Sequence, residues 1–325
     1  MVKANLFSTW WIKVYSCRSV TRAFVVTKSW ARFLYRLFWW WDTSLITIDD
    51  PRFFPGGRRA IKIYGGLITD RRVRLGDVED SESPYLGPIR RDGIATLPQF
   101  IDIDLLRTLR DEAMALFSEG SQTTEVHNGS HIQVVEPLVA CPTAATIAFD
   151  DRLVELASQF FSCVPAVVSS NLRLSLPYTG PTSGVNLFHQ DFNSPGQSFK
   201  CFLYLTDVES FNGPLSYVMG SHQKLPRNWS RELRWADNTI EKIYGKEKIR
   251  VMTGSVGDLI IGDMRGFHKG ERILSGSRLM FTINYLIHPE MDGLFSELPR
   301  TCIREADVEA LSDAKRPVAD FLIRV

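Results

Sequence analysis

Two stretches in which apolar and polar residues alternate constrain the fold of this chain more than any other feature. Within residues 169–176 three leucines alternate with polar side chains, and residues 278–286 alternate in a similar way. A period of two predicts a strand whose two faces differ in environment. One face of the first strand carries Ser169, Asn171, Arg173 and Ser175, and one face of the second carries the mainly polar set Arg278, Met280, Thr282 and Asn284. Such faces can line a ligand pocket.

Further short strands are predicted at residues 199–207, 215–219 and 257–263. Turns rich in glycine and proline separate them, for example at 177–184 and 212–214. The pattern lacks the regular alternation of strand and helix that a parallel α/β sheet requires. Many short strands with such turns favour two packed antiparallel sheets.

Two helices are predicted beside these strands, at residues 104–118 and 150–161, each with an apolar face. They are expected to cover the outside of the larger sheet. The predicted fold class is therefore mainly β with flanking helices (α+β), built around a double-stranded β-helix, or jelly-roll, of the cupin kind.

Three side chains suggest a metal site. His189 and Asp191 stand two residues apart, so an extended segment points both to one face, and His268 follows a predicted buried strand. Two imidazoles and one carboxylate can bind non-haem Fe(II) and leave positions open. Arg278, ten residues after the second histidine, can pair with a carboxylate. A second His-x-Glu, at 288–290, has no later histidine to complete a site.

Residues from about 90 to 290 resemble the phytanoyl-CoA dioxygenase family. The resemblance rests on several motifs in one order: Arg91-Asp92-Gly93, His189-Gln190-Asp191, residues 203–208, Asn212-Gly213-Pro214-Leu215, Gly220-Ser221-His222, Gly257-Asp258, His268 and Arg278. It implies that His189, Asp191 and His268 bind iron and that Arg278 anchors the distal carboxylate of 2-oxoglutarate. In the family, Gly220-Ser221-His222 forms a turn outside the metal site, so His222 is not expected to be a ligand.

The resemblance also implies Fe(II), 2-oxoglutarate and O₂ as cofactor and cosubstrates, and a small-molecule or lipid-like substrate. Asp191 stands where related halogenases have a small residue, which indicates hydroxylation with release of succinate and CO₂. Desaturation, epoxidation, cyclisation and a catalytically silent binding protein remain alternatives. Met280 departs from the Ser or Thr of many members, and Thr282, Asn171 and Lys200 are each candidates for that cosubstrate contact. The sequence does not identify the substrate.

The N-terminal segment 1–41 differs in composition from the rest. It holds seven Lys or Arg, no Asp or Glu, and six of the eight Trp residues. Its apolar residues recur at helical spacing, opposite several arginines. Three interpretations stay open: a helix on an anionic membrane surface, an organelle transit peptide, and a helix that packs on the domain or on a second subunit. No nucleic-acid-binding motif accompanies the charge.

The remaining chain divides by composition. Residues 42–89 are predicted to be a connecting region with a possible hairpin, and residues 90–325 the jelly-roll domain. A helical insertion at 224–250 is expected to cover the barrel mouth, where its aromatic residues either contact substrate or pack the lid. Residues 125–131, which include His127 and His131, are expected to form a solvated loop, with the lining of the substrate entrance as the alternative. Five scattered cysteines indicate a reducing interior, and hence a cytoplasmic location.

Overall fold

The computed structural model describes residues 83–118, 124–127, 130–180, 184–191, 198–223, 234–287 and 300–325. All of them belong to one compact unit, Ile68–Val325. The basic segment 1–41 and the hairpin predicted within 42–89 lie outside the described residues. No helix in the described part of the chain is long and apolar enough to cross a membrane.

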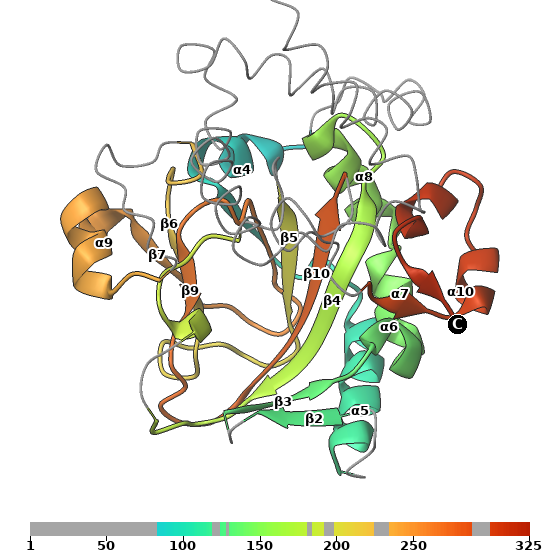
Figure 1. Ribbon diagram of the computed structural model, residues 1–325, viewed down its shortest axis with the longest axis horizontal. Helices are drawn as coiled ribbons and strands as arrows, with labels where there is room; N and C mark the ends of the chain where they lie inside the picture. The colour runs from blue at the N-terminus through green and yellow to red at the C-terminus, as the bar shows by residue number, and fades with distance from the viewer. Residues whose placement is uncertain are drawn as a thin grey trace, which may run out of the picture. The chain divides into compact units, whose positions relative to one another are not determined.

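A large antiparallel sheet forms the centre of the molecule (Figure 1). Its seven strands have the order β1-β8-β5-β10-β4-β3-β2, so strands distant in sequence lie side by side. Their bounds are β1 (Ile94–Leu97), β2 (Thr124–His127), β3 (His131–Val134), β4 (Ala166–Ser175), β5 (Phe199–Tyr204), β8 (Leu259–Gly262) and β10 (Arg278–Leu286). The two strands predicted from alternation, β4 and β10, pair with each other along their lengths.

A smaller antiparallel sheet lies across the barrel from the helices within residues 103–161 (Figure 1). It consists of β7 (Ile249–Met252), β6 (Leu215–Val218) and β9 (His268–Gly270), in that order. Two antiparallel bridges, Phe188 to Trp235 and His189 to His268, extend it. The two packed antiparallel sheets confirm the predicted fold class.

Helices cover the outer face of the large sheet (Figure 1). The two predicted helices are confirmed as α5 (Ile103–Ser118) and α8 (Asp151–Phe161). Helix α8 begins where it does because the Asp150 carboxylate accepts hydrogen bonds from two free backbone N–H groups of the first turn. The other elements are α4 (Leu86–Asp92), α6 (Pro137–Ala140), α7 (Pro142–Ala148), β11 (Cys302–Ile303), α10 (Glu305–Glu309), η4 (Arg316–Ala319) and β12 (Ile323–Arg324).

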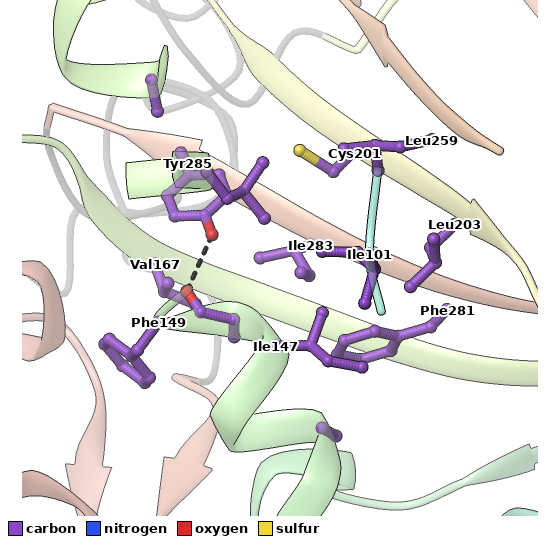
Figure 2. Packing of buried hydrophobic residues seen from close by; sticks show 14 of the residues in the cluster. Ile101, Ile147, Phe149, Val167, Cys201, Leu203, Leu259, Phe281, Ile283 and Tyr285 are labelled. Atoms are coloured by element: carbon purple, nitrogen blue, oxygen red, sulfur yellow. Dashed lines mark hydrogen bonds between the residues drawn. The ribbon is translucent and has the colours of Figure 1, made fainter. Parts of the chain in front are cut away.

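The main hydrophobic core lies between these helices and the large sheet (Figure 2). Ile147 from α7 packs on Phe281 and Ile283, whose side chains alternate with the polar ones along β10. Tyr285 is fully buried there, and its hydroxyl donates to the carbonyl of Ala148 at 2.7 Å. Because the apolar face of β10 points to the helices, its polar face points into the barrel.

Two predictions about connecting segments need revision. Residues 125–127 and 131 belong to strands: β2 and β3 pair antiparallel and extend the large sheet, with Glu125 opposite Gln133. Of the insertion predicted at 224–250, residues 224–233 lie outside the described part, and the described remainder contains α9 (Asp237–Tyr244), η3 (Lys246–Lys248) and the first two residues of β7. Each strand of the β2–β3 hairpin has only four residues, and in β3 only Ile132 and Val134 alternate with polar residues, which is too short a run to mark a strand in sequence.

Candidate metal centre

The two histidines of the predicted metal site lie directly opposite each other. His189 follows the short helix η2 (Gly184–Asn186), and His268 begins β9. Each backbone N–H donates to the other residue's carbonyl at 2.9 Å. Because paired residues of an antiparallel ladder point to the same face, both imidazoles project together, with ring centroids 4.3 Å apart.

Backbone carbonyls orient both imidazole rings. Nδ1 of His189 lies 2.9 Å from the carbonyl oxygen of Leu187, and Nδ1 of His268 lies 2.9 Å from that of Gly266. A carbonyl can only accept, so Nδ1 carries the proton in each ring and Nε2 presents its lone pair. This arrangement is typical of metal-binding histidines.

The Asp191 carboxylate completes the group. Its backbone N–H donates to the carbonyl of Met264 at 2.8 Å, which holds this residue beside the segment that leads to His268. Oδ1 lies 3.8 Å from Nε2 of His189 and 3.7 Å from Nε2 of His268. One ligand atom from each of the three side chains lies within 4.8 Å of the others. Two nitrogens and one carboxylate oxygen fit the donor set of non-haem Fe(II).

The electrostatics of the centre suit a cation. Burial, helped by the neighbouring His268, lowers the pKa of His189 to about 3. Burial also lowers the pKa of His268. Burial acts to raise the pKa of Asp191, but Lys200 and the two histidines outweigh it and hold that pKa below its usual range. At neutral pH the imidazoles are therefore neutral and the carboxylate is ionised, which are the forms that bind metal.

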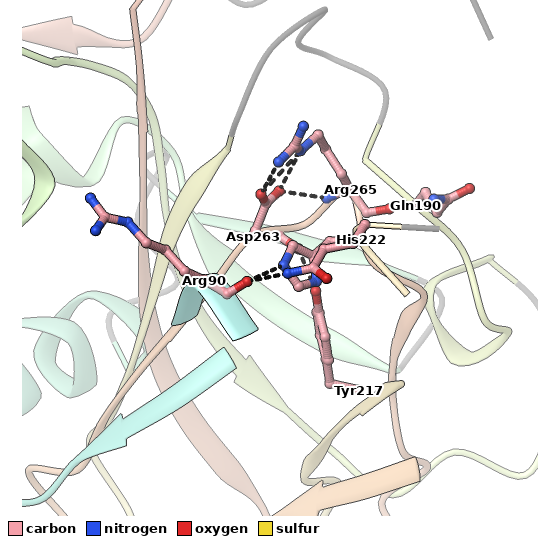
Figure 3. Close-up of polar contacts among 7 residues, drawn as sticks. Arg90, Gln190, Tyr217, His222, Asp263 and Arg265 are labelled. Atoms are coloured by element: carbon pink, nitrogen blue, oxygen red, sulfur yellow. Dashed lines mark hydrogen bonds and ion pairs between the residues drawn. The ribbon is translucent and has the colours of Figure 1, made fainter. Parts of the chain in front are cut away.

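Polar contacts behind the histidines fix the segment from Asp263 to His268 (Figure 3). Arg265 pairs with both oxygens of the buried Asp263 carboxylate, at 2.6–3.0 Å. The hydroxyl of Tyr217 donates to the carbonyl of Asp263 at 2.7 Å. From Gly220-Ser221-His222, the Ser221 hydroxyl accepts a hydrogen bond from the backbone N–H of Phe267 at 2.8 Å.

His222 lies in this supporting layer (Figure 3). Its Nε2 donates to the carbonyl of Arg90 at 3.1 Å, and the metal-binding cluster found in the described residues does not include it. The side chain of Gln190, between the two ligand candidates in sequence, bonds the carbonyl of Arg265 instead. The geometry thus agrees with the expectation that His222 is no ligand.

Arg278 lies at the start of β10 and is 8% exposed. One terminal nitrogen donates to the carbonyl of Gly213, whose φ of 84° lies in the left-handed region that favours glycine. Its Nε is buried and has no hydrogen-bond partner. A buried guanidinium with an unused N–H fits a ligand carboxylate.

The three other candidates for cosubstrate contacts each have a protein partner. The Thr282 hydroxyl donates to the carbonyl of Asn171 at 3.3 Å. The Asn171 amide donates to Oε1 of Gln133 at 3.1 Å. Lys200 Nζ lies 2.9 Å from Oδ2 of Asp191. All three side chains lie on the same face of the sheet as Arg278. None of them makes a described contact with Arg278.

Some residues of the site were not identified from sequence. Ser221 supports the metal centre through a backbone N–H, and Asp263 and Arg265 support it through their ion pair. The sequence alone did not assign either role. For the aromatic residues Trp235 and Tyr244, the sequence left two roles open, substrate contact and packing. Both pack against Phe267 at centroid distances of 5.8 Å, and Trp235 is 6% exposed, so the described contacts of both side chains are packing contacts. Trp229 lies outside the described residues.

Comparison with known proteins agrees with this geometry. A family model described as phytanoyl-CoA dioxygenase (PhyH) matches residues 89–280, more than half of the chain. Ectoine dioxygenase from Halomonas elongata is 25% identical over 236 residues, which are 61% of this chain and 69% of that protein.

Two solved structures are similar in fold. EctD from S. alaskensis with bound Fe has a TM-score of 0.56 at 18% identity, over 77% of this chain and 90% of that one. The epimerase SnoN in complex with Fe3+, alpha ketoglutarate and nogalamycin RO has a TM-score of 0.52 at 16% identity, over 71% and 95%.

Proposed function

The chain belongs to the phytanoyl-CoA dioxygenase family, and from this premise we propose that it hydroxylates a small-molecule or lipid-like substrate. It is an Fe(II)- and 2-oxoglutarate-dependent oxygenase of that family. When bound, iron and 2-oxoglutarate supply the activation of O₂, with release of succinate and CO₂. The observation that carries the proposal is the convergence of His189, His268 and Asp191, with both Nε2 atoms free of protons.

Each of these residues has a separate task in the proposal. His189, His268 and Asp191 hold iron, and Arg278 pairs with the distal carboxylate of 2-oxoglutarate. Trp235 packs against Phe267, on the opposite face of the segment from His268, and so supports the strand that carries this ligand. Because Asp191 supplies a carboxylate at the third ligand position, oxygen transfer is favoured over halogenation.

The product mass distinguishes oxygen insertion, by hydroxylation or epoxidation, from desaturation and ring closure. Hydroxylation or epoxidation of an alkene adds one oxygen atom, whereas desaturation or ring closure removes two hydrogen atoms. The choice among them depends on substrate placement within about 1 Å. Mass spectrometry of a turned-over substrate with ¹⁸O₂ therefore decides between them, and a product that lacks ¹⁸O and has lost two hydrogens contradicts hydroxylation.

The first experiment is an anaerobic titration of metal-free protein with Fe(II) and then 2-oxoglutarate, monitored by the visible iron-to-ketoacid absorption band. We expect the band in the wild type and its loss in His189→Ala. The matched control is His131→Ala, which alters a histidine of the sheet edge. A wild type that gives no band under any tested condition contradicts the oxygenase proposal and favours a binding protein on this fold.

The four described cysteines, Cys141, Cys163, Cys201 and Cys302, are free thiols. Free thiols suit a reducing compartment, which also keeps iron as Fe(II). We therefore propose a cytoplasmic location. Detection of the protein in a cell fraction that contains secreted proteins would contradict it.

For the N-terminal segment 1–41, we propose contact with an anionic membrane surface or with a second copy of the chain. The proposal rests on the basic, tryptophan-rich composition alone. The full chain and a variant that lacks residues 1–41 are to be compared by co-sedimentation with phosphatidylserine vesicles and by light scattering. A full chain that neither sediments nor self-associates contradicts both forms of contact.

A further inference from the structure

A second guanidinium, that of Arg173, lies next to Arg278 in the barrel. Arg173 is on β4 and stands in register with Met280 of β10, two residues from Arg278 on the same face. The two arginines are therefore diagonal neighbours across adjacent strands, a separation that long side chains bridge. Arg173 lowers the pKa of Arg278, after the larger effect of burial, so the two charges lie close enough to interact.

Both guanidinium groups have an unused buried donor. Nε of Arg173 and Nε of Arg278 are sealed from solvent and have no hydrogen-bond partner. Their other described contacts are weak or neutral: Arg173 reaches Oε1 of Gln133 at 3.5 Å, and Arg278 bonds the carbonyl of Gly213. No ion pair within the described residues involves either arginine. Two adjacent cations without an anion, Arg278 buried and Arg173 half-buried, cost free energy until an anion binds between them.

One carboxylate can satisfy both groups. Its two oxygens offer about four acceptor sites, enough for N–H donors from two guanidiniums. Arg173 is also the donor best placed to serve beside Arg278. Met280, between them, has no N–H or O–H group in its side chain, and Thr282, Asn171 and Lys200 donate to protein acceptors.

We propose that Arg173 and Arg278 form a two-guanidinium site for a single carboxylate, the distal carboxylate of 2-oxoglutarate. This inference rests on the proposed function and adds a second binding residue to it. Arg173 supplies the cosubstrate contact for which the sequence offered Thr282, Asn171 and Lys200 as candidates. In the free protein the two arginines repel each other, and the bound dicarboxylate removes that repulsion. Selectivity for a ketoacid with a distal carboxylate follows.

The test compares two ketoacids that differ at the distal end. 2-Oxoglutarate has the carboxylate, and 2-oxovalerate has a methyl group in its place. Affinities are measured anaerobically on the Fe(II)-loaded protein from the visible absorption band. We expect Arg173→Gln to weaken 2-oxoglutarate binding by about ten- to hundredfold, the effect of losing a charge-assisted hydrogen bond. Binding of 2-oxovalerate is expected to change less than about twofold.

Two further variants test whether Arg173→Gln lowers the affinity only by disturbing the fold. Arg173→Lys keeps the charge without the planar fork, so it is expected to recover part of the affinity for 2-oxoglutarate. Arg107→Gln removes an exposed arginine of α5 and is the matched control, expected to change neither affinity. The melting temperature of metal-free Arg173→Gln is expected not to fall, because the substitution removes repulsion between buried charges.

The possible results separate the inference from the proposed function. Unchanged binding of 2-oxoglutarate in Arg173→Gln overturns the inference and assigns the carboxylate to Arg278 alone. Equal weakening of both ketoacids also overturns it, since the effect is then not directed at the distal carboxylate. In both cases the wild-type band is intact and the proposed function stands. A wild type without a band for either ketoacid rejects the proposed function, and the inference with it.

Discussion

Lys200 forms an ion pair with one oxygen of the Asp191 carboxylate and leaves the other oxygen facing the two histidines. Lys200 Nζ lies 2.9 Å from Oδ2, while Oδ1 lies 3.7–3.8 Å from the Nε2 atoms of the two histidines. A carboxylate held in this way presents a single oxygen to a cation. Lys200 therefore acts on the metal centre through Asp191, by fixing which oxygen faces the histidines.

Replacement of Lys200 by methionine tests this role. Outer contacts that orient a metal ligand typically change metal affinity by 10–100-fold. We expect Lys200→Met to weaken binding of Fe(II), or of Co(II) as its spectroscopic substitute, by about tenfold. Lys315→Met is the control, because Lys315 also forms a short ion pair, with Asp151, but at the start of α8. Unchanged metal affinity in Lys200→Met would remove Lys200 from the positioning role.

Arg278 is predicted to act on the cosubstrate and not on the metal. Arg278→Gln removes the charge of a buried guanidinium whose Nε has no protein partner. We expect 2-oxoglutarate affinity to fall by about tenfold or more, the size of a lost charge-assisted bond, while metal affinity stays the same. Calorimetric titration with 2-oxoglutarate and Co(II) measures both. Full cosubstrate affinity in Arg278→Gln would contradict the assignment.

His222 and His268 provide a contrast between a supporting residue and a ligand. His268→Ala is expected to abolish 2-oxoglutarate turnover, because it removes one of three metal-binding groups. His222→Ala is expected to leave metal binding intact, since Nε2 of His222 faces the carbonyl of Arg90. Iron content after desalting, measured beside succinate release, distinguishes them. The assignments are wrong if His268→Ala turns over as fast as the wild type.

The alternating strands were predictable because burial of one face leaves a period of two in the sequence. β4 and β10 are such strands, and their pairing brings Arg173, Asn171 and Thr282 onto one face. The metal ligands were predictable because the chemistry requires those residue types. Their geometry was not, since the pairing of His189 with His268 joins residues 79 positions apart in the chain.

The supporting contacts were not predictable for a different reason. Ser221 holds Phe267 through a backbone N–H, and any residue except proline at position 267 would offer the same group. The hairpin β2–β3 was not predicted because its strands have four residues each and only Val134 of β3 is buried in the main core. The role of Arg173 became visible only when its register with Met280 was known.

The metal-free protein is predicted to lose stability as the pH falls below about 6.5. The folded-state pKa of His189 is about 3, below the value of about 6.5 in an unfolded chain, so the unfolded chain binds more protons in this window. Burial shifts the pKa of His268 and of His222 in the same direction. The stability that His189 contributes is fully present above about pH 6.5 and falls by about 1.4 kcal/mol per pH unit below it, and His268 and His222 change stability in the same direction.

Urea unfolding of the metal-free protein between pH 7.5 and 4.5 measures this dependence. His189→Gln is expected to flatten the slope, because one buried imidazole no longer has to stay neutral. Titration of Asp191 does not contribute to the pH dependence in this range, because its pKa is shifted below the usual carboxyl range. A stability that is independent of pH over this range would contradict the buried, neutral state of the histidines.

Trp235 is predicted to stabilise the fold by packing and not to serve as a substrate contact. It is 6% exposed, lies edge-on to Phe267, and its backbone pairs with Phe188, next to His189. Trp235→Ala is expected to lower the free energy of unfolding by about 3–5 kcal/mol, the usual range for a buried tryptophan. Trp235→Phe should recover part of that loss. Val251→Ala, on the exposed face of β7, is the control and should change stability little. If Trp235→Ala instead keeps full stability and loses only turnover, the side chain contacts substrate and the packing interpretation is wrong.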